Sequence, residues 1–413
     1  MKKLLLILML FTVMVLNGCT NGGTETDQEY DDLQAEQDDQ QIEEDEPEIE
    51  EDDAQEEEDL QEEQDDPPVE DSLLTEAREF DVASGEHGYL AVQWIEHMND
   101  YLPNRLAFSD RELETAEWLV ETLLEMGFDE SQVEMQTFSY DGETSSWWGN
   151  ATMMIQMYES MGDYDGLERI DYSQNVILTI PGRSTETIIM GAHYDGVGNP
   201  GMSDNAGGTV LLLENAYRMR DIDHYYTLQY VFFGAEEVGL IGAFHFVDHM
   251  TQEEIDNLIL MINADVIMDG PNLVYSIGYI DKMPAYPMDL LWELPDISQN
   301  ALSEQVKETA DQLNAEQNTE LISKPSAINT PSDQLAFIQF GIPVMIFYST
   351  HPVDYPELAP DDAWITDLFI GDVLHTDRDC LDYLVANHPG RVERALHEFG
   401  LFLEELASSE FVQ

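Results

Sequence analysis

The sequence predicts an α/β fold of three layers, with a mostly parallel central sheet between two layers of helices. Short runs of continuous apolar residues, bounded by polar residues and glycine, are typical of strands buried on both faces. Residues 185–192, TETIIMGA, are one such run. Residues 209–219, TVLLLENAYRM, follow it with apolar residues at helical spacing. Because strands and helices alternate in this way along the chain, the strands should run mostly parallel and be covered on both faces.

The first element expected from the pattern is a helix over residues 109–128. Ser109 is a suitable N-cap with Glu112 three residues later, and Gly127 ends the helix. Residues 144–165 are rich in Trp and Met, which favours an edge strand or a packed loop. Further strands are expected at residues 175–182, 185–192, 228–235, 258–266 and 341–349, and further helices at 209–219, 240–250, 301–313 and 389–406.

Residues 1–18 are typical of a signal peptide, because Lys2 and Lys3 precede a short apolar stretch. That stretch is shorter than the about 20 residues that span a bilayer as a helix. Cys19 ends a Leu-Asn-Gly-Cys sequence that resembles a bacterial lipoprotein box, so Cys19 is the expected lipidation site. We therefore expect an extracytoplasmic protein that is lipid-anchored to the outer face of the cell membrane.

Residues 19–71 are expected to form a disordered acidic tether behind the lipidated cysteine. Residues 20–71 contain 27 Asp or Glu and no Lys or Arg, so they cannot bury enough apolar surface to fold. Residues 72–413 form the predicted catalytic domain. The formal net charge of the chain is -72, which excludes electrostatic binding to nucleic acid or to an anionic membrane surface. Cys380 is the only cysteine beyond the tether, so that domain has no internal disulfide.

Candidate metal ligands begin in residues 191–208, GAHYDGVGNPGMSDNAGG. His193 and Asp195 lie where a predicted strand ends, and Asp204 lies where a predicted helix begins. The carboxyl edge of an open α/β sheet is where ligands bind. In an extended segment, residues i and i+2 point the same way. Asp195 could therefore accept the second ring N–H of His193 while the other nitrogen binds a metal.

Further candidate ligands follow the later strands. Glu236 and Glu237 are adjacent at the end of one strand, so one carboxylate can bind metal while the other carries protons. Asp265 ends the next strand, and His375 stands in VLHTDRDC. Imidazole and carboxylate groups in this combination are a zinc-type donor set with room for a bound water.

The motifs HYD, SDNAGG, GAEEVGLIGA, INAD and HTDRD, in this order, resemble those of the co-catalytic di-zinc aminopeptidases of the bacterial leucyl aminopeptidase and aminopeptidase Y type. The resemblance covers most of residues 75–410, and the five motifs together are highly specific. The sequence departs from the family at Gln334, where the family usually has His, and at Cys380, where it commonly has Thr. The resemblance implies the zinc exopeptidase fold, peptide substrates and two zinc ions, although cobalt or manganese could occupy the same ligands.

The resemblance also implies a role for each residue of the predicted site. His193 and Asp265 would bind one zinc ion, Glu237 and His375 the other, and Asp204 would bridge the two. Asp195 would orient His193. Glu236 would be the general base that takes the proton of a water activated by the two cations and passes it to the leaving amine.

Other functions remain open on the same fold, namely a glutaminyl cyclase, a carboxypeptidase and a non-catalytic binding domain. His351 competes with His375 as the last ligand, but it is a lone His in a proline-rich loop. An HExxH metalloprotease motif is absent at His245, because Phe246 follows it. Ser203 lacks the glycine two residues later that a serine-hydrolase elbow needs. The specificity pocket is expected to come from loops, with residues 147–148 and 281–330 as candidates.

Overall fold

The computed structural model describes residues 83–139, 151–279, 300–324, 332–338, 340–350 and 373–411. The predicted signal peptide, Cys19, the acidic tether and both predicted domain boundaries lie outside the described residues, as do His351 and residues 147–148. Of the candidate specificity segment 281–330, only residues 300–324 are described.

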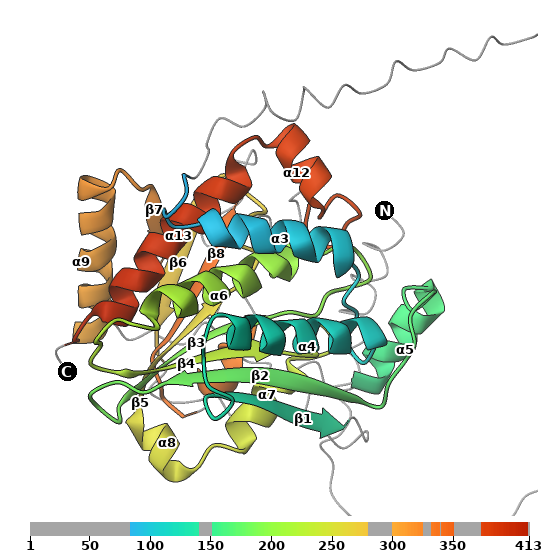
Figure 1. Cartoon of the computed structure of the whole chain (residues 1–413), viewed down its shortest axis with the longest axis horizontal. Helices are drawn as coiled ribbons and strands as arrows, with labels where there is room; N and C mark the ends of the chain where they lie inside the picture. Colours follow the sequence, from blue (N-terminus) through green and yellow to red (C-terminus); the bar gives the residue numbers. More distant parts are fainter. Residues whose placement is uncertain are drawn as a thin grey trace, which may run out of the picture. The chain divides into compact units, whose positions relative to one another are not determined.

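An eight-stranded sheet forms the centre of the fold, in the order β1-β2-β4-β3-β5-β8-β6-β7 (Figure 1). Strands β4, β3, β5 and β8 are parallel neighbours, whereas β2 pairs antiparallel with β4, and β6 pairs antiparallel with β8. The prediction of a mostly parallel sheet is therefore confirmed for its centre. The strands are β1 (Val133–Ser139), β2 (Tyr172–Ile180), β3 (Thr187–His193), β4 (Thr227–Phe233), β5 (Leu258–Ala264), β6 (Asn272–Gly278), β7 (Leu321–Lys324) and β8 (Val344–Thr350).

Helices cover both faces of this sheet. Successive residues of a strand point to opposite faces, so each strand contributes side chains to both helical layers. In β3, Ile188 and Met190 pack into one apolar cluster, and Ile189 between them packs into another. The first cluster contains residues of α3, α4, α6 and α13, which lie in front of the sheet in Figure 1. The second cluster contains residues of α7 and α10. The predicted three layers are thus confirmed. The helices are α3 (Tyr89–Tyr101), α4 (Asp110–Glu125), α5 (Ala151–Met161), α6 (Gly207–Met219), α7 (Ile241–Asp248), α8 (Gln252–Asn257), α9 (Ala301–Glu316), α10 (Leu335–Ile338), α12 (Leu381–Asn387) and α13 (Arg391–Ser408).

One predicted element is wrong. The sequence favours an edge strand or packed loop within residues 144–165, but Ala151–Met161 forms helix α5. Ile155 and Tyr158, three positions apart, are buried in one apolar cluster that also contains Phe108 and Val238. That spacing places both side chains on one helix face, so packing against the body of the protein decides the conformation.

Ser109 caps α4 as predicted, since its hydroxyl accepts the N–H of Glu112. The Glu112 side chain does not return to the N–H of Ser109, as it would in a capping box. It accepts the N–H of Phe108 instead, at 2.6 Å.

Within the described part of the chain, no helix is long and apolar enough to cross a membrane.

Candidate metal centre

The candidate ligands come together at one edge of the sheet. His193 is the last residue of β3, Asp265 directly follows β5, and Glu236 and Glu237 follow β4. Because β4, β3 and β5 are adjacent and parallel, their carboxyl ends open at the same edge. Asp204 reaches this edge from a kinked segment, Met202–Ala206, whose backbone is not helical at Asp204 and which leads into α6.

The donor atoms form two groups that share Asp204. In the first group, His193 Nε2 lies 3.2 Å from an Asp204 oxygen and 3.2 Å from an Asp265 oxygen. In the second, His375 Nε2 lies 3.0 Å from the other Asp204 oxygen and 3.6 Å from Glu237 Oε2. Within each group one donor atom per residue lies within 4.8 Å of the others. These are the same two sets that the family resemblance implies.

The electrostatics of the site follow from burial combined with excess negative charge. Burial raises the pKa of Glu236 and of Glu237 well above the ordinary value of a glutamate. Burial alone would lower the pKa of His193, but the carboxylates of Asp265 and Glu236 raise it well above its ordinary value. Such a set of groups is one that a bound cation would stabilise.

The residues present fit a bound zinc ion. Imidazole nitrogens and carboxylate oxygens are both zinc donors. In addition, Glu237 Oε1 is buried and has no hydrogen-bond partner among the described residues, so it is available to a metal. A third possible set of donors, His193 with Glu236 and Glu237, also lies within 4.8 Å.

The Asp195 carboxylate lies 3.5 Å from His193 Nδ1, the second ring nitrogen that the sequence prediction places beside it. Its two oxygens also accept the backbone N–H groups of Glu236, at 3.0 Å, and Glu237, at 3.2 Å. Asp195 therefore faces the imidazole and also fixes the backbone that carries both glutamates.

A model of peptidase family M28 matches residues 175–400, more than half of the chain and all of the site described above. The chain belongs to peptidase family M28. This membership confirms the resemblance carried by the five motifs.

Individual M28 relatives align over shorter stretches. Aminopeptidase YwaD of Bacillus subtilis is 35% identical over 83 residues, which are 20% of this chain and 18% of that protein. The chain spans about a fifth of the length of the first curated relatives it matches.

Among solved structures, BSAP, a zinc aminopeptidase from Bacillus subtilis, superposes with a TM-score of 0.55 at 16% identity, covering 80% of this chain and 97% of that one. A glutaminyl cyclase from an Acidobacteriales bacterium superposes with a TM-score of 0.51 at 16% identity, covering 79% and 97%. Both structures share the fold.

Two further carboxylates near the M28 site were not assigned a role from the sequence. Asp379 accepts the N–H of Ser203 at 2.5 Å and the N–H of Asp204 at 3.0 Å, and thereby orients the shared ligand. Burial raises the pKa of Asp379 to about 7. Asp333 is fully buried, and neither of its oxygens has a hydrogen-bond partner in the described residues. The HTDRD motif could have indicated Asp379, and the TPSDQ sequence Asp333.

Gln334, which replaces the usual family histidine, has a structural contact. Its side-chain oxygen accepts a hydrogen bond from Asn263 Nδ2 at 2.9 Å, and Asn263 also donates to Ser332 Oγ at 2.8 Å. Cys380 is a free thiol at the N-terminus of α12. Neither departure from the family pattern removes a donor from the two groups that share Asp204.

Arg105 links the two ends of the loop between His193 and Asp204. Its fully buried guanidinium donates to the carbonyl oxygens of Tyr194, Pro200 and Gly201, at 2.6, 2.9 and 2.7 Å. Burial lowers the pKa of Arg105 to about 10, against the opposing effect of Asp379 and other carboxylates of the site. Arg105 precedes the region matched by the M28 model and lies in the sequence LPNRL, at residues 102–106.

Proposed function

We propose that this chain is a zinc-dependent aminopeptidase that releases N-terminal residues from peptides with two zinc ions. The observation that carries the proposal is the pair of donor groups that share Asp204. In this arrangement His193 and Asp265 would hold one ion, Glu237 and His375 would hold the other, and Asp204 would be available to both. The zinc aminopeptidase BSAP has the same fold, which supports the choice of metal.

Zinc bound by these residues would supply Lewis acidity for the scissile carbonyl and for a nucleophilic water. Glu236 acts as the general base. Its carboxylate accepts a proton from the attacking water at an Oε atom and returns that proton to the leaving amine. Burial raises the pKa of Glu236, the direction that makes its carboxylate a stronger base. Asp195 keeps Glu236 and Glu237 in place through their backbone N–H groups.

A glutaminyl cyclase or a carboxypeptidase is the second candidate. The cyclase is supported by the structural similarity to a glutaminyl cyclase, whose TM-score of 0.51 is close to the 0.55 of the zinc aminopeptidase BSAP. The filled second donor group, Asp204 with Glu237 and His375, favours the two-metal hydrolase over a single-metal cyclase.

Metal content together with substrate profile separates these functions. We expect about two zinc ions per purified chain and release of p-nitroaniline from aminoacyl p-nitroanilides. Chelation should reduce that activity by more than about 100-fold, and added zinc should restore it. The N-acetylated form of the best substrate is the matched control and should not be hydrolysed. One zinc ion with cyclisation of N-terminal glutamine would instead establish the cyclase, and the absence of bound metal would favour a binding domain.

We further propose that the protein is extracytoplasmic and held at the membrane by lipid on Cys19. The support is the Leu-Asn-Gly-Cys sequence behind the apolar segment, followed by the acidic stretch. In cells grown with labelled palmitate, the native protein should carry the label and sediment with membranes. Cys19→Ala should lose the label. Equal labelling of the two proteins would overturn the lipid anchor.

A further inference from the structure

Four consecutive backbone N–H groups lead into the Glu236 and Glu237 pair, and a side chain binds each of them. The N–H of Gly234 donates to Asn175 Oδ1 at 3.2 Å, and that of Ala235 donates to Glu112 Oε1 at 3.0 Å. The next two N–H groups donate to Asp195, as described above. This segment, residues 234–237, is thus fixed by side chains rather than by a neighbouring strand.

Ala235 is the point in this segment that most needs support. Its φ is 54°, in the left-handed region that a non-glycine residue adopts only at a conformational cost. Its carbonyl oxygen accepts the N–H of Ile241 at 3.1 Å, and its N–H is bound by Glu112. Rotation of the peptide on either side of Ala235 would move the Glu236 side chain, so these two contacts act together with Asp195 to set where Glu236 points.

Glu112 is itself rigidly held. It is fully buried on α4 and accepts hydrogen bonds from the N–H of Phe108 and, at 2.7 Å, from the hydroxyl of Ser173. A methyl group at Gly234 would lie 3.0 Å from Glu112 Oε1 and 2.5 Å from Ser173 Oγ, so the carboxylate fits closely against the segment. Burial raises the pKa of Glu112 well above its ordinary value, and the hydrogen bonds from Ser173, Phe108 and Ala235 oppose that shift.

We propose that Glu112 is a positioning residue for Glu236, acting through the Ala235 N–H to hold the Glu236 side chain in its catalytic orientation. The inference rests on the function proposed above for Glu236. It assigns a role in the site to helix α4, which lies outside the region matched by the family model. Glu112 does not reach substrate or metal in this role, because its contacts are with Phe108, Ser173 and Ala235.

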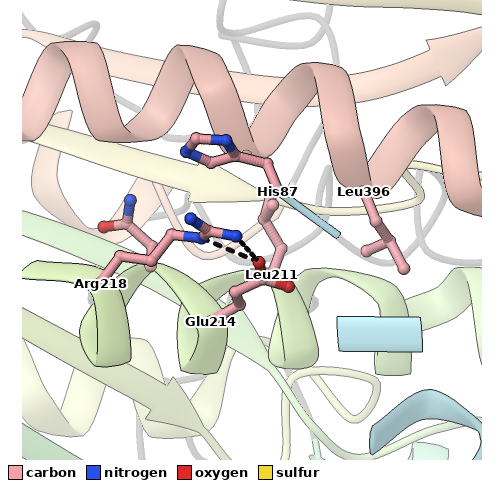
Figure 2. Close-up of a pocket in the computed structure, with 7 residues that line it drawn as sticks. His87, Leu211, Glu214, Arg218 and Leu396 are labelled. Carbon is pink, nitrogen blue, oxygen red and sulfur yellow. Dashed lines mark hydrogen bonds and ion pairs between the residues drawn. The ribbon is translucent and has the colours of Figure 1, made fainter. Parts of the chain in front are cut away.

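Glu214 provides a matched control within the same chain. It is a buried glutamate on α6 that accepts the N–H groups of Gly88, at 3.0 Å, and Ala91, at 2.8 Å, at the start of α3. Figure 2 shows Glu214 paired with Arg218 beside His87 and Leu396. Glu214 belongs to neither donor group of the metal centre. Substitution there tests the general cost of losing a buried carboxylate that binds backbone amides.

The experiment compares Glu112→Met and Glu214→Met in the full chain. Methionine has a similar length but cannot replace the carboxylate as a strong acceptor. In Glu112→Met we expect hydrogen exchange at amides 235–237 to accelerate by about tenfold or more. We also expect kcat to fall by about 10- to 100-fold, because a small displacement of the base is costly, with KM within about threefold. Zinc content should be unchanged. Glu214→Met should accelerate exchange at residues 88–91 and leave kcat within about twofold.

Two further variants make the result decisive. Glu112→Gln can turn its single oxygen toward Ser173 and Ala235, whereas its NH₂ group cannot accept the Phe108 N–H. Because the contact with Ala235 is kept, kcat should fall less than in Glu112→Met. The Glu112→Asp side chain is too short to reach both Phe108 and Ala235, so it should show the same loss of kcat and the same faster exchange as Glu112→Met. It therefore provides the test if Glu112→Met does not fold. Unchanged exchange at residues 235–237, or an equal loss of kcat in Glu214→Met, would overturn the proposal. So would loss of folding in both Glu112→Met and Glu112→Asp. If the native chain hydrolyses no substrate, the proposed function fails, and the exchange data still decide whether Glu112 holds this segment.

Discussion

Substitution of Glu236 with glutamine should lower kcat for aminoacyl p-nitroanilides by about 10²–10⁴-fold, the usual contribution of a general base, while zinc remains bound. Glutamine preserves the size of the side chain and cannot accept the proton. The backbone N–H that bonds to Asp195 is unaffected by this change, so the segment should keep its conformation. The measurement is kcat and zinc content on the same preparations of native and variant protein.

Glu237→Gln is the adjacent control, because its expected effect is on metal content, whereas Glu236→Gln should lower kcat with zinc still bound. Glu237 Oε2 faces His375 Nε2 at 3.6 Å within the second donor group. Its substitution should lower zinc content from about two ions per chain to about one. If Glu236→Gln instead lost metal while Glu237→Gln kept it, the assignment of base and ligand would have to be exchanged.

The site is predictable from sequence where each ligand terminates an apolar strand. His193 and Asp265 follow continuous buried runs, and strands β3 and β5 pair in parallel, so the two side chains meet at 3.2 Å. The polar residue at the end of each run is visible without any knowledge of the partner strand. The spacing of apolar residues gives both the strand and its end.

The supporting contacts cannot be predicted in this way, because they join segments far apart in the chain. Glu112 occupies a position in α4 typical of a capping box, but its carboxylate is bound by Ser173 and Ala235, 61 and 123 residues away. Helix α5 also depends on distant partners, since Ile155 and Tyr158 are buried in one apolar cluster with Phe108 and Val238. The local pattern contains no information on which distant group fills such a position.

Substitution of Asp204 with asparagine should remove both metal ions, which is the largest change in metal content expected from a single ligand. The two oxygens of Asp204 face different histidines, His193 at 3.2 Å and His375 at 3.0 Å. Burial would raise the pKa of Asp204, but its bonds to His193 and His375 hold that pKa below the ordinary value, so the group stays ionised. Asparagine offers one oxygen and an NH₂ group without charge, and it therefore cannot bridge two cations. We expect zinc affinity to fall by more than about 100-fold at both positions, with parallel loss of activity, measured by titration against a competing chelator.

Asp333→Asn is the control that separates bridging from a general effect of charge. Asp333 is also a fully buried carboxylate, and burial raises its pKa well above the ordinary value, but it belongs to neither donor group. Its substitution should leave two ions bound, because no donor atom is lost. If Asp204→Asn removed only one ion, the groups would bind metal independently, and Asp204 would belong to one of them. If Asp333→Asn removed both, the metals would depend on the total negative charge of the site rather than on a shared carboxylate.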